Sequence, residues 1–147
     1  AEFGMDGAIW CVNYRKLKSH LPPPLQELLR EEGADVFTTE LLGRGAESLS
    51  ALDRLAPEPF ALFLEPPSLD DRIVNQFALF ALMSGAQARL DAWLAEREGL
   101  TRRIIIPAAL KWEVRDKLDQ ANITERVLFP GLDGLSRWLT RYYTPKR

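Results

Sequence analysis

The sequence has little of several features that mark particular protein classes. It contains one cysteine and one histidine among its 147 residues. A single cysteine excludes an internal disulfide framework and a multi-cysteine metal site, so we expect a reducing, cytoplasmic setting. No apolar run approaches the roughly 20 residues that a membrane-spanning helix requires. The net charge of −2 lacks the excess of Lys and Arg that neutralises phosphates, so we expect neither a membrane partner nor a nucleic-acid partner.

The residues that could act as nucleophiles or phosphate binders are equally sparse. His20 sits in a basic turn ahead of three prolines, where an ordinary surface role is the simplest interpretation. Cys11 lies in an apolar run and is expected to behave as a small buried hydrophobe. The stretch Gly43-Arg44-Gly45 is too short to match a glycine-rich phosphate loop. We therefore expect no metal site and no self-sufficient catalytic constellation.

What the sequence does contain is typical of a globular chain. Apolar residues make up 46% and charged residues 27%. Residues 1–4 have the look of a cloning remnant ahead of Met5, so the expectation is one domain over residues 5–147. Its length is sufficient to bury a substantial core.

Hydrophobic periodicity together with Pro and Gly punctuation predicts an α+β fold, in which a small sheet of short strands packs with about six helices. We expect buried strands or extended segments over residues 7–13, 60–64, 77–83 and 102–106. We expect helices or helical turns over residues 14–19, 25–32, 46–55, 69–76, 86–98, about 107–118 and 132–143. The segment 27–47 carries six acids against two arginines and is interpreted as a solvated face.

The segment from Asp70 to Phe80 is the most informative part of the chain. It places Arg72, Asn75 and Gln76 against an otherwise apolar run. Polar side chains in such surroundings cost free energy unless they are hydrogen-bonded. They either fasten a structural junction or face a cleft and bind a ligand, and the sequence leaves both interpretations open.

The start of the same segment carries the signals of a helix N-terminus. Ser68 and Asp71 have the spacing of a capping box, and the adjacent acids Asp70 and Asp71 suit the positive end of a helix dipole.

Two further features concern charge and aromatic side chains. Arg137, Arg141, Lys146 and Arg147 form a basic tail that could steer an anionic partner, although cations near a helix C-terminus are the simpler account. Trp112 lies off the apolar stripe of its predicted helix, so it either packs on a second layer or contributes to an interface.

Three blocks of the sequence resemble the C-terminal half of the FRG domain, a bacterial family named for a Phe-Arg-Gly motif. Residues 6–13 (DGAIWCVN) look like the central strand of the family. Residues 71–76 (DRIVNQ), followed by Leu79 and Phe80, look like its Arg-x-x-x-Gln plus Phe block. Residues 104–107, 122–124 and 128–135 look like its ending, and LFPGLDGL is the most specific of these matches. The Phe-Arg-Gly motif and the upstream Leu-Leu-Asp-Trp-Thr-like block of the family are missing from this chain.

The resemblance implies a candidate chemistry. The order of the family's blocks is similar to that of ADP-ribosyltransferases, whose third motif usually supplies a glutamate that polarises the nicotinamide ribose. In that comparison Gln76 takes the catalytic place of the glutamate, and Arg72, Asn75 and Phe80 line one wall of the ligand site. A glutamine can hydrogen-bond a ribose hydroxyl but cannot ionise. NAD is therefore the cofactor only if the comparison holds, and we expect the chain to be catalytically incomplete by itself.

The alternative function is a non-enzymatic protein-interaction module. Its partner would be a second copy of the chain or the missing N-terminal half of the domain. The apolar run from Ile9 to Val12 is expected to leave an unpaired strand edge, which is a template for pairing and favours a homodimer.

Overall fold

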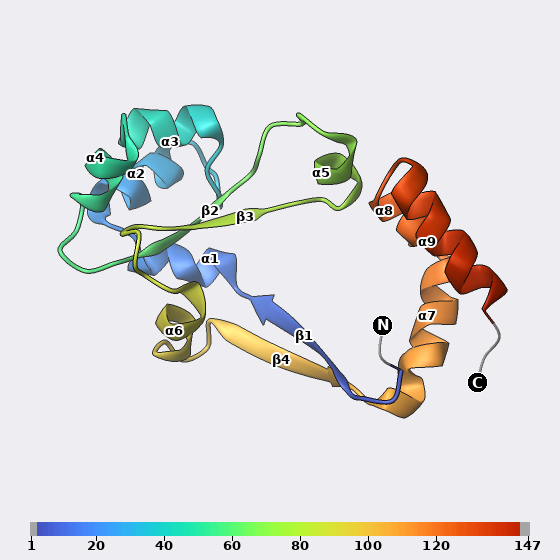
Figure 1. Ribbon diagram of the computed structural model, residues 1–147. Coiled ribbons are helices and arrows are strands. Elements are labelled where there is room, and N and C mark those ends of the chain that lie inside the picture. The colour runs from blue at the N-terminus through green and yellow to red at the C-terminus, as the bar shows by residue number, and fades with distance from the viewer. Residues whose placement is uncertain (1–2, 145–147) are drawn as a thin grey trace. The chain divides into compact units, whose positions relative to one another are not determined.

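A computed structural model describes residues 3–144 and divides the chain into two compact units. The core unit comprises residues 10–67 and 79–103, and the terminal unit comprises residues 1–9, 68–78 and 104–147. Both units are built from segments that are far apart in the sequence (Figure 1). The expectation of one domain over residues 5–147 stays a prediction.

The α+β class is confirmed, although the described residues form two small sheets in place of the single one expected. The strands are β1 (Gly7–Val12), β2 (Ala61–Leu64), β3 (Phe80–Met83) and β4 (Thr101–Ile106). The α-helices of the described chain are α1 (Tyr14–Leu17), α2 (Pro23–Glu31), α3 (Thr39–Gly45), α4 (Leu49–Asp53), α5 (Asp71–Asn75), α6 (Leu90–Ala95), α7 (Lys111–Gln120), α8 (Glu125–Leu128) and α9 (Leu132–Tyr143). The 3₁₀ turns η1 (Lys18–His20) and η2 (Ala108–Leu110) precede α2 and α7. β1 pairs with β4, and β2 pairs with β3.

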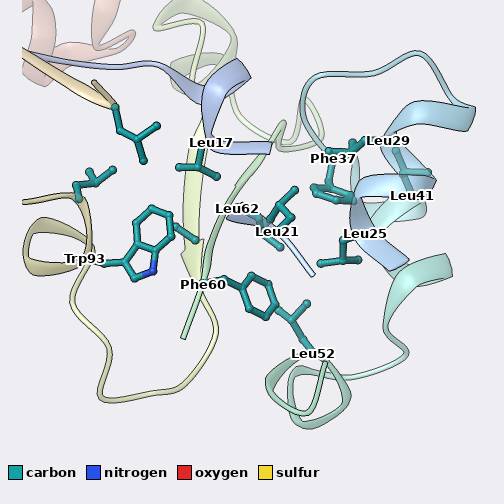
Figure 2. Close-up of a cluster of buried hydrophobic side chains, with 13 residues drawn as sticks. Leu17, Leu21, Leu25, Leu29, Phe37, Leu41, Leu52, Phe60, Leu62 and Trp93 are labelled. Carbon is teal, nitrogen blue, oxygen red and sulfur yellow. The ribbon is translucent and has the colours of Figure 1, made fainter. Parts of the chain in front are cut away.

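The hydrophobic core lies entirely in the core unit. Leucines of α1, α2, α3 and α4 form one cluster there with Phe37, Phe60 and Leu62 (Figure 2). Leu25 and Leu29 stand one turn apart on α2, so the amphipathic stripe of that helix points into the cluster. Trp93 and Leu94 of α6 are also buried, as the apolar face predicted for residues 86–98 requires. That helix is shorter than predicted.

The sheet of the core unit is held by main-chain pairing and by two buried polar anchors. β2 and β3 are antiparallel, with Ala61 opposite Met83 and Leu64 opposite Phe80. Ser84 is buried, and its hydroxyl accepts a hydrogen bond from the Phe60 amide at 2.8 Å. The indole N–H of Trp93 donates to the Pro59 carbonyl at 2.9 Å. These bonds satisfy polar atoms that burial would otherwise leave costly.

The interpretation of residues 27–47 as one solvated face is wrong. Phe37 and Leu41 are buried in the core, and α3 begins after Thr38, whose hydroxyl accepts a hydrogen bond from the Leu41 amide at 3.1 Å. The acids of this segment stay outside, where Glu32 pairs with Arg44. The high acid content concealed a short capped helix with an apolar inner side.

The first predicted strand exists, but the expectation that it is buried is wrong. Trp10 of β1 is 65% exposed, and Ile9 is about half exposed. Cys11 is likewise exposed and is not the small core residue that was expected. The reason is that β1 has only β4 as a neighbour in the described chain, so one edge of each strand stays unpaired. The unpaired edge predicted beside Ile9–Val12 is therefore present.

Candidate functional site

The candidate site starts at α5, a short helix with a well-defined beginning and end. Its N-cap is Asp70, whose carboxylate accepts a hydrogen bond from the Arg72 amide at 2.6 Å. The capping box predicted from Ser68 and Asp71 is thus wrong, and the acid between them takes the role. At the other end, the Phe77 amide bonds to the Val74 carbonyl and the Ala78 amide to the Ile73 carbonyl. This pair of bonds is the Schellman motif, which satisfies carbonyls at the end of a helix.

The three polar residues predicted as a site do come together, and they converge on one segment of the terminal unit. The Asn75 side-chain amide donates to the Val127 carbonyl at 2.9 Å, and the Gln76 side-chain amide donates to the Leu128 carbonyl at 2.8 Å. The Arg72 guanidinium lies over the Phe129 ring at 4.8 Å from its centroid. The hydrogen bonds run to backbone carbonyls of α8 rather than between the three side chains.

These contacts favour the interpretation in which the polar residues fasten a junction. The last carbonyls of any helix lack partners within the helix, and Asn75 and Gln76 supply donors to two of them in α8. The side-chain NH₂ group of Gln76 is directed to a protein carbonyl, and an amide cannot take up a proton as a base. A catalytic role for Gln76 and a ligand-binding role for Arg72 and Asn75 stay predictions.

Phe80, the fourth predicted site residue, belongs to the core unit. It is the first residue of β3, and its backbone pairs with Leu64 of β2. Its ring is about half exposed. Its ligand-binding role also stays a prediction. His20 is exposed, as expected, and its ring meets the edge of Trp93 at 5.9 Å between centroids.

The main polar centre of the terminal unit is one that the sequence did not reveal. Arg141 of α9 donates to both oxygens of Asp119, at 2.7 and 2.8 Å, and to both oxygens of Glu125, at 2.7 and 2.5 Å. Its side chain is only 18% exposed. These hydrogen bonds, which Arg141 donates and the two carboxylates accept, raise the pKa of Arg141 and lower the pKa of both carboxyls. The centre thus joins α7, α8 and α9.

This finding corrects the interpretation of the basic tail. The charge of Arg141 is satisfied by two carboxylates within the chain, so it neither steers a partner nor acts through the helix end alone. Arg137 is exposed, and its guanidinium lies 5.9 Å from the centroid of the Phe129 ring. Lys146 and Arg147 lie outside the described residues.

A groove of about 660 Å³ runs beside this centre in the terminal unit. Its lining combines apolar side chains with cations, and the residues are Phe3, Lys111, Val114, Arg115, Leu118, Glu125, Ser136, Arg137, Thr140 and Arg141. Phe3, although assigned to the cloning remnant, stacks on Trp112 at 4.0 Å between centroids, and Arg115 lies over the same indole at 4.4 Å. Trp112 therefore packs against neighbours within its own unit.

A second groove, of about 630 Å³, belongs to the core unit. Its lining is mostly apolar and comes from β1, α6, the loop before α6 and β4, with Trp10, Val12, Arg89, Leu90, Asp91, Leu94, Ala95 and Thr101. Arg89 and Asp91 are paired with each other at 2.6 Å. Among the described residues, no group of three or more His, Cys, Asp or Glu side chains is placed to hold a metal ion.

The two units differ in the burial of their apolar side chains. In the described part of the terminal unit, the buried residues are Thr124 and Gly134, and no large apolar side chain is among them. Phe77 is 93% exposed and Leu132 is 83% exposed. Exposed apolar side chains that gather into one patch mark interaction sites.

Comparison of the chain with protein-family models, with curated proteins and with solved structures finds no match in any of the three. The resemblance to the FRG domain therefore stays a prediction from the residues that carry it. Within residues 3–144, no helix is long and apolar enough to cross a membrane.

Proposed function

We propose that the chain is a non-enzymatic protein-interaction module of FRG type, and that its terminal unit presents the binding surface. The observation that carries the proposal is the lack of any buried large apolar side chain in the described part of that unit. Burying one such side chain is worth about 1.5–3 kcal/mol. Burial of several such side chains against a partner would therefore contribute a binding free energy that the unit does not gain by folding alone.

Polar contacts provide the internal order of the terminal unit in place of a core. Arg141 ties α9 to α7 and α8, and Asn75 and Gln76 tie α5 to α8. Directional bonds of this kind fix the shape of the unit while the apolar side chains remain accessible. Fixing the shape beforehand lowers the entropic cost of binding a partner. The partner is a second copy of the chain or a polypeptide that corresponds to the N-terminal half of the FRG domain.

The accessible apolar surface can be measured directly. Anilinonaphthalene sulfonate, a dye that fluoresces on apolar surfaces, is expected to bind the folded chain saturably while the near-UV circular dichroism signal is retained. That combination separates a native surface from a molten state, in which the near-UV signal is lost. A folded chain that binds no dye would show that the surface is covered within the chain, and the proposal would fail.

The same proposal predicts that the chain neither hydrolyses NAD nor transfers ADP-ribose. The Gln76 side-chain amide is bonded to the Leu128 carbonyl, and a transfer site needs several positioned groups acting together. Incubation with labelled NAD and candidate acceptors is expected to give only the background rate for the unchanged chain and for Gln76→Ala. Gln87→Ala, at an exposed glutamine outside this contact, is the matched control. Turnover that Gln76→Ala abolishes and Gln87→Ala preserves would establish an enzyme instead.

A further inference from the structure

The end of α5 places a bulky residue in a backbone conformation that such residues rarely adopt. Three helices of the described chain, α2, α5 and α7, end in the same Schellman motif. The residue after the C-cap is Gly33 in α2 with φ +63°, Asn122 in α7 with φ +57° and Phe77 in α5 with φ +49°. Glycine and asparagine adopt this left-handed conformation readily, whereas for a bulky residue it is strained. The chain uses favourable residues twice and an unfavourable one at Phe77.

The strained residue also exposes its side chain. The Phe77 ring is 93% exposed, so the unfavourable backbone is not offset by burial within the chain. Leu69 and Val74, at the beginning and in the middle of the same segment, are exposed as well. The Schellman hydrogen bonds hold this backbone conformation, but they do not explain why a bulky residue occupies the position, and strained residues of this kind cluster at functional sites. An exposed aromatic ring on a fixed turn has the properties of an anchor that fills a pocket on a partner.

The charged residues near Phe77 indicate which surface the ring contacts. Asp71, at the start of α5, is exposed and has no cationic partner among residues 3–144. Arg137, on the rim of the α7–α9 groove, has no carboxylate partner in the same described range. The lining of that groove is apolar at Val114 and Leu118. An acidic, apolar projection and a basic-rimmed, apolar groove are complementary, and both belong to this chain.

The two surfaces are also neighbours on one unit. The Phe129 ring is contacted by Arg72 of α5 and by Arg137 of α9, so it lies between the projection and the groove rim. A symmetric dimer requires both halves of the contact on one continuous face, so that each copy gives and receives the same element. The α5 projection, Phe129 and the groove rim form such a face.

We infer that two copies of the chain form a symmetric dimer in which Phe77 of each copy enters the α7–α9 groove of the other, with Asp71 facing Arg137 across the interface. The inference rests on the proposed interaction function and names its partner and its anchor.

The anchor is tested by Phe77→Gly, which is expected to stabilise the folded chain and to weaken its association. Glycine relieves the left-handed strain, so the thermal midpoint of the monomer, measured at a concentration too low for association, rises by a few degrees, while loss of the ring weakens the dimer about tenfold or more. Asn122→Gly is the matched control, because it changes the same position of the α7 motif and is expected to leave association unchanged. Sedimentation velocity from low to high micromolar concentration and a thermal melt give the two readouts.

The charge contact is tested with two single variants and their mixture. In a homodimer, Asp71→Arg brings two cations together at each of the two symmetric contacts, and Arg137→Asp brings two acids together at each. Each variant alone is therefore expected to be monomeric where the unchanged chain is dimeric. An equimolar mixture of the two variants can form a heterodimer. At one of its contacts the original Asp71 and Arg137 pair is kept, and at the other the same two positions carry opposite charges with the polarity reversed. The mixture is therefore expected to recover the dimer. Destabilised folding cannot explain recovery on mixing, because each variant is present unchanged in the mixture.

The outcomes separate this inference from the proposed function. An unchanged chain that stays monomeric but binds the dye overturns the dimer and leaves the interaction function standing. A monomer that binds no dye overturns both. Open-ended polymers, an unchanged dimer in Phe77→Gly, or a mixture that fails to associate would each overturn the symmetric contact.

Discussion

Gly134→Ala is expected to destabilise the chain by about 3 kcal/mol or more, the upper range for overpacking a close contact. Gly134 is in the first turn of α9 and is buried against α8 and the loop that follows it. A Cβ atom added there would overlap the Phe129 carbonyl oxygen and would lie 2.7 Å from the Glu125 carbonyl oxygen. Both neighbours are backbone atoms, so relief requires α8 and α9 to move apart.

The effect has a matched control elsewhere in the chain. Gly43 lies inside α3, where a Cβ would meet nothing within 4 Å. Gly43→Ala is therefore expected to stabilise by about 0.5–1 kcal/mol, because alanine favours helix over glycine by that amount. Urea unfolding followed by circular dichroism measures both variants. Equal, small effects of the two substitutions would show that α8 and α9 do not pack as described.

This close contact also gives a physical reason for the most specific block of the FRG resemblance. The block LFPGLDGL contains two glycines with different requirements. Gly131 has φ +106°, a conformation that L side chains rarely adopt, and it starts α9. Gly134 is needed for the approach of α9 to α8. The motif therefore encodes a tight turn and a close approach between α8 and α9.

Sequence signals that act through the local backbone predict helix α2 correctly. The helix predicted over residues 25–32 is α2, which Pro23 starts and Gly33 follows, because both residues act through backbone conformation alone. Leu25 and Leu29 then follow from the helical period. The α+β class came from the same reasoning. By contrast, the high acid content of residues 27–47 conceals α3. The apolar spacing of Phe37 and Leu41 and the N-cap Thr38 are the signals that indicate this helix.

Structural properties that depend on residues far apart in the chain could not be predicted from the sequence. The burial of β1 depends on how many strands flank it, and only β4 does so in the described chain. Gln76 and Asn75 could be recognised as polar residues that require partners, but those partners are carbonyls 52 residues away. The pairing of Arg141 with Asp119 and Glu125 was equally invisible, because nothing in a basic tail indicates which acids of other helices face it.

Arg141→Met is expected to destabilise the chain by about 2–3 kcal/mol at neutral pH. Hydrogen bonds to charged groups contribute about 1.5–3 kcal/mol each, and partial exposure of the two carboxylates reduces the sum. Removal of the guanidinium leaves Asp119 and Glu125 without the cation that both of them bind. Arg141→Lys keeps the charge without the planar fork that contacts both acids in pairs, so its loss is expected to be intermediate. Arg54→Met, at an exposed arginine outside this centre, is the control with little effect on unfolding.

The pH dependence of this loss identifies its cause. Because Arg141 lowers the pKa of Asp119 and Glu125 in the folded chain, the stabilisation is fully present above their unfolded values of about 4 and disappears as the pH falls through the lower folded values. The difference between the unchanged chain and Arg141→Met is therefore expected to be largest near neutral pH and to shrink steadily below about pH 4. Urea unfolding of both chains across that range measures it. A difference that is independent of pH would mean that Arg141 stabilises α9 through the packing of its aliphatic stem, and that the two carboxylates contribute nothing to the junction.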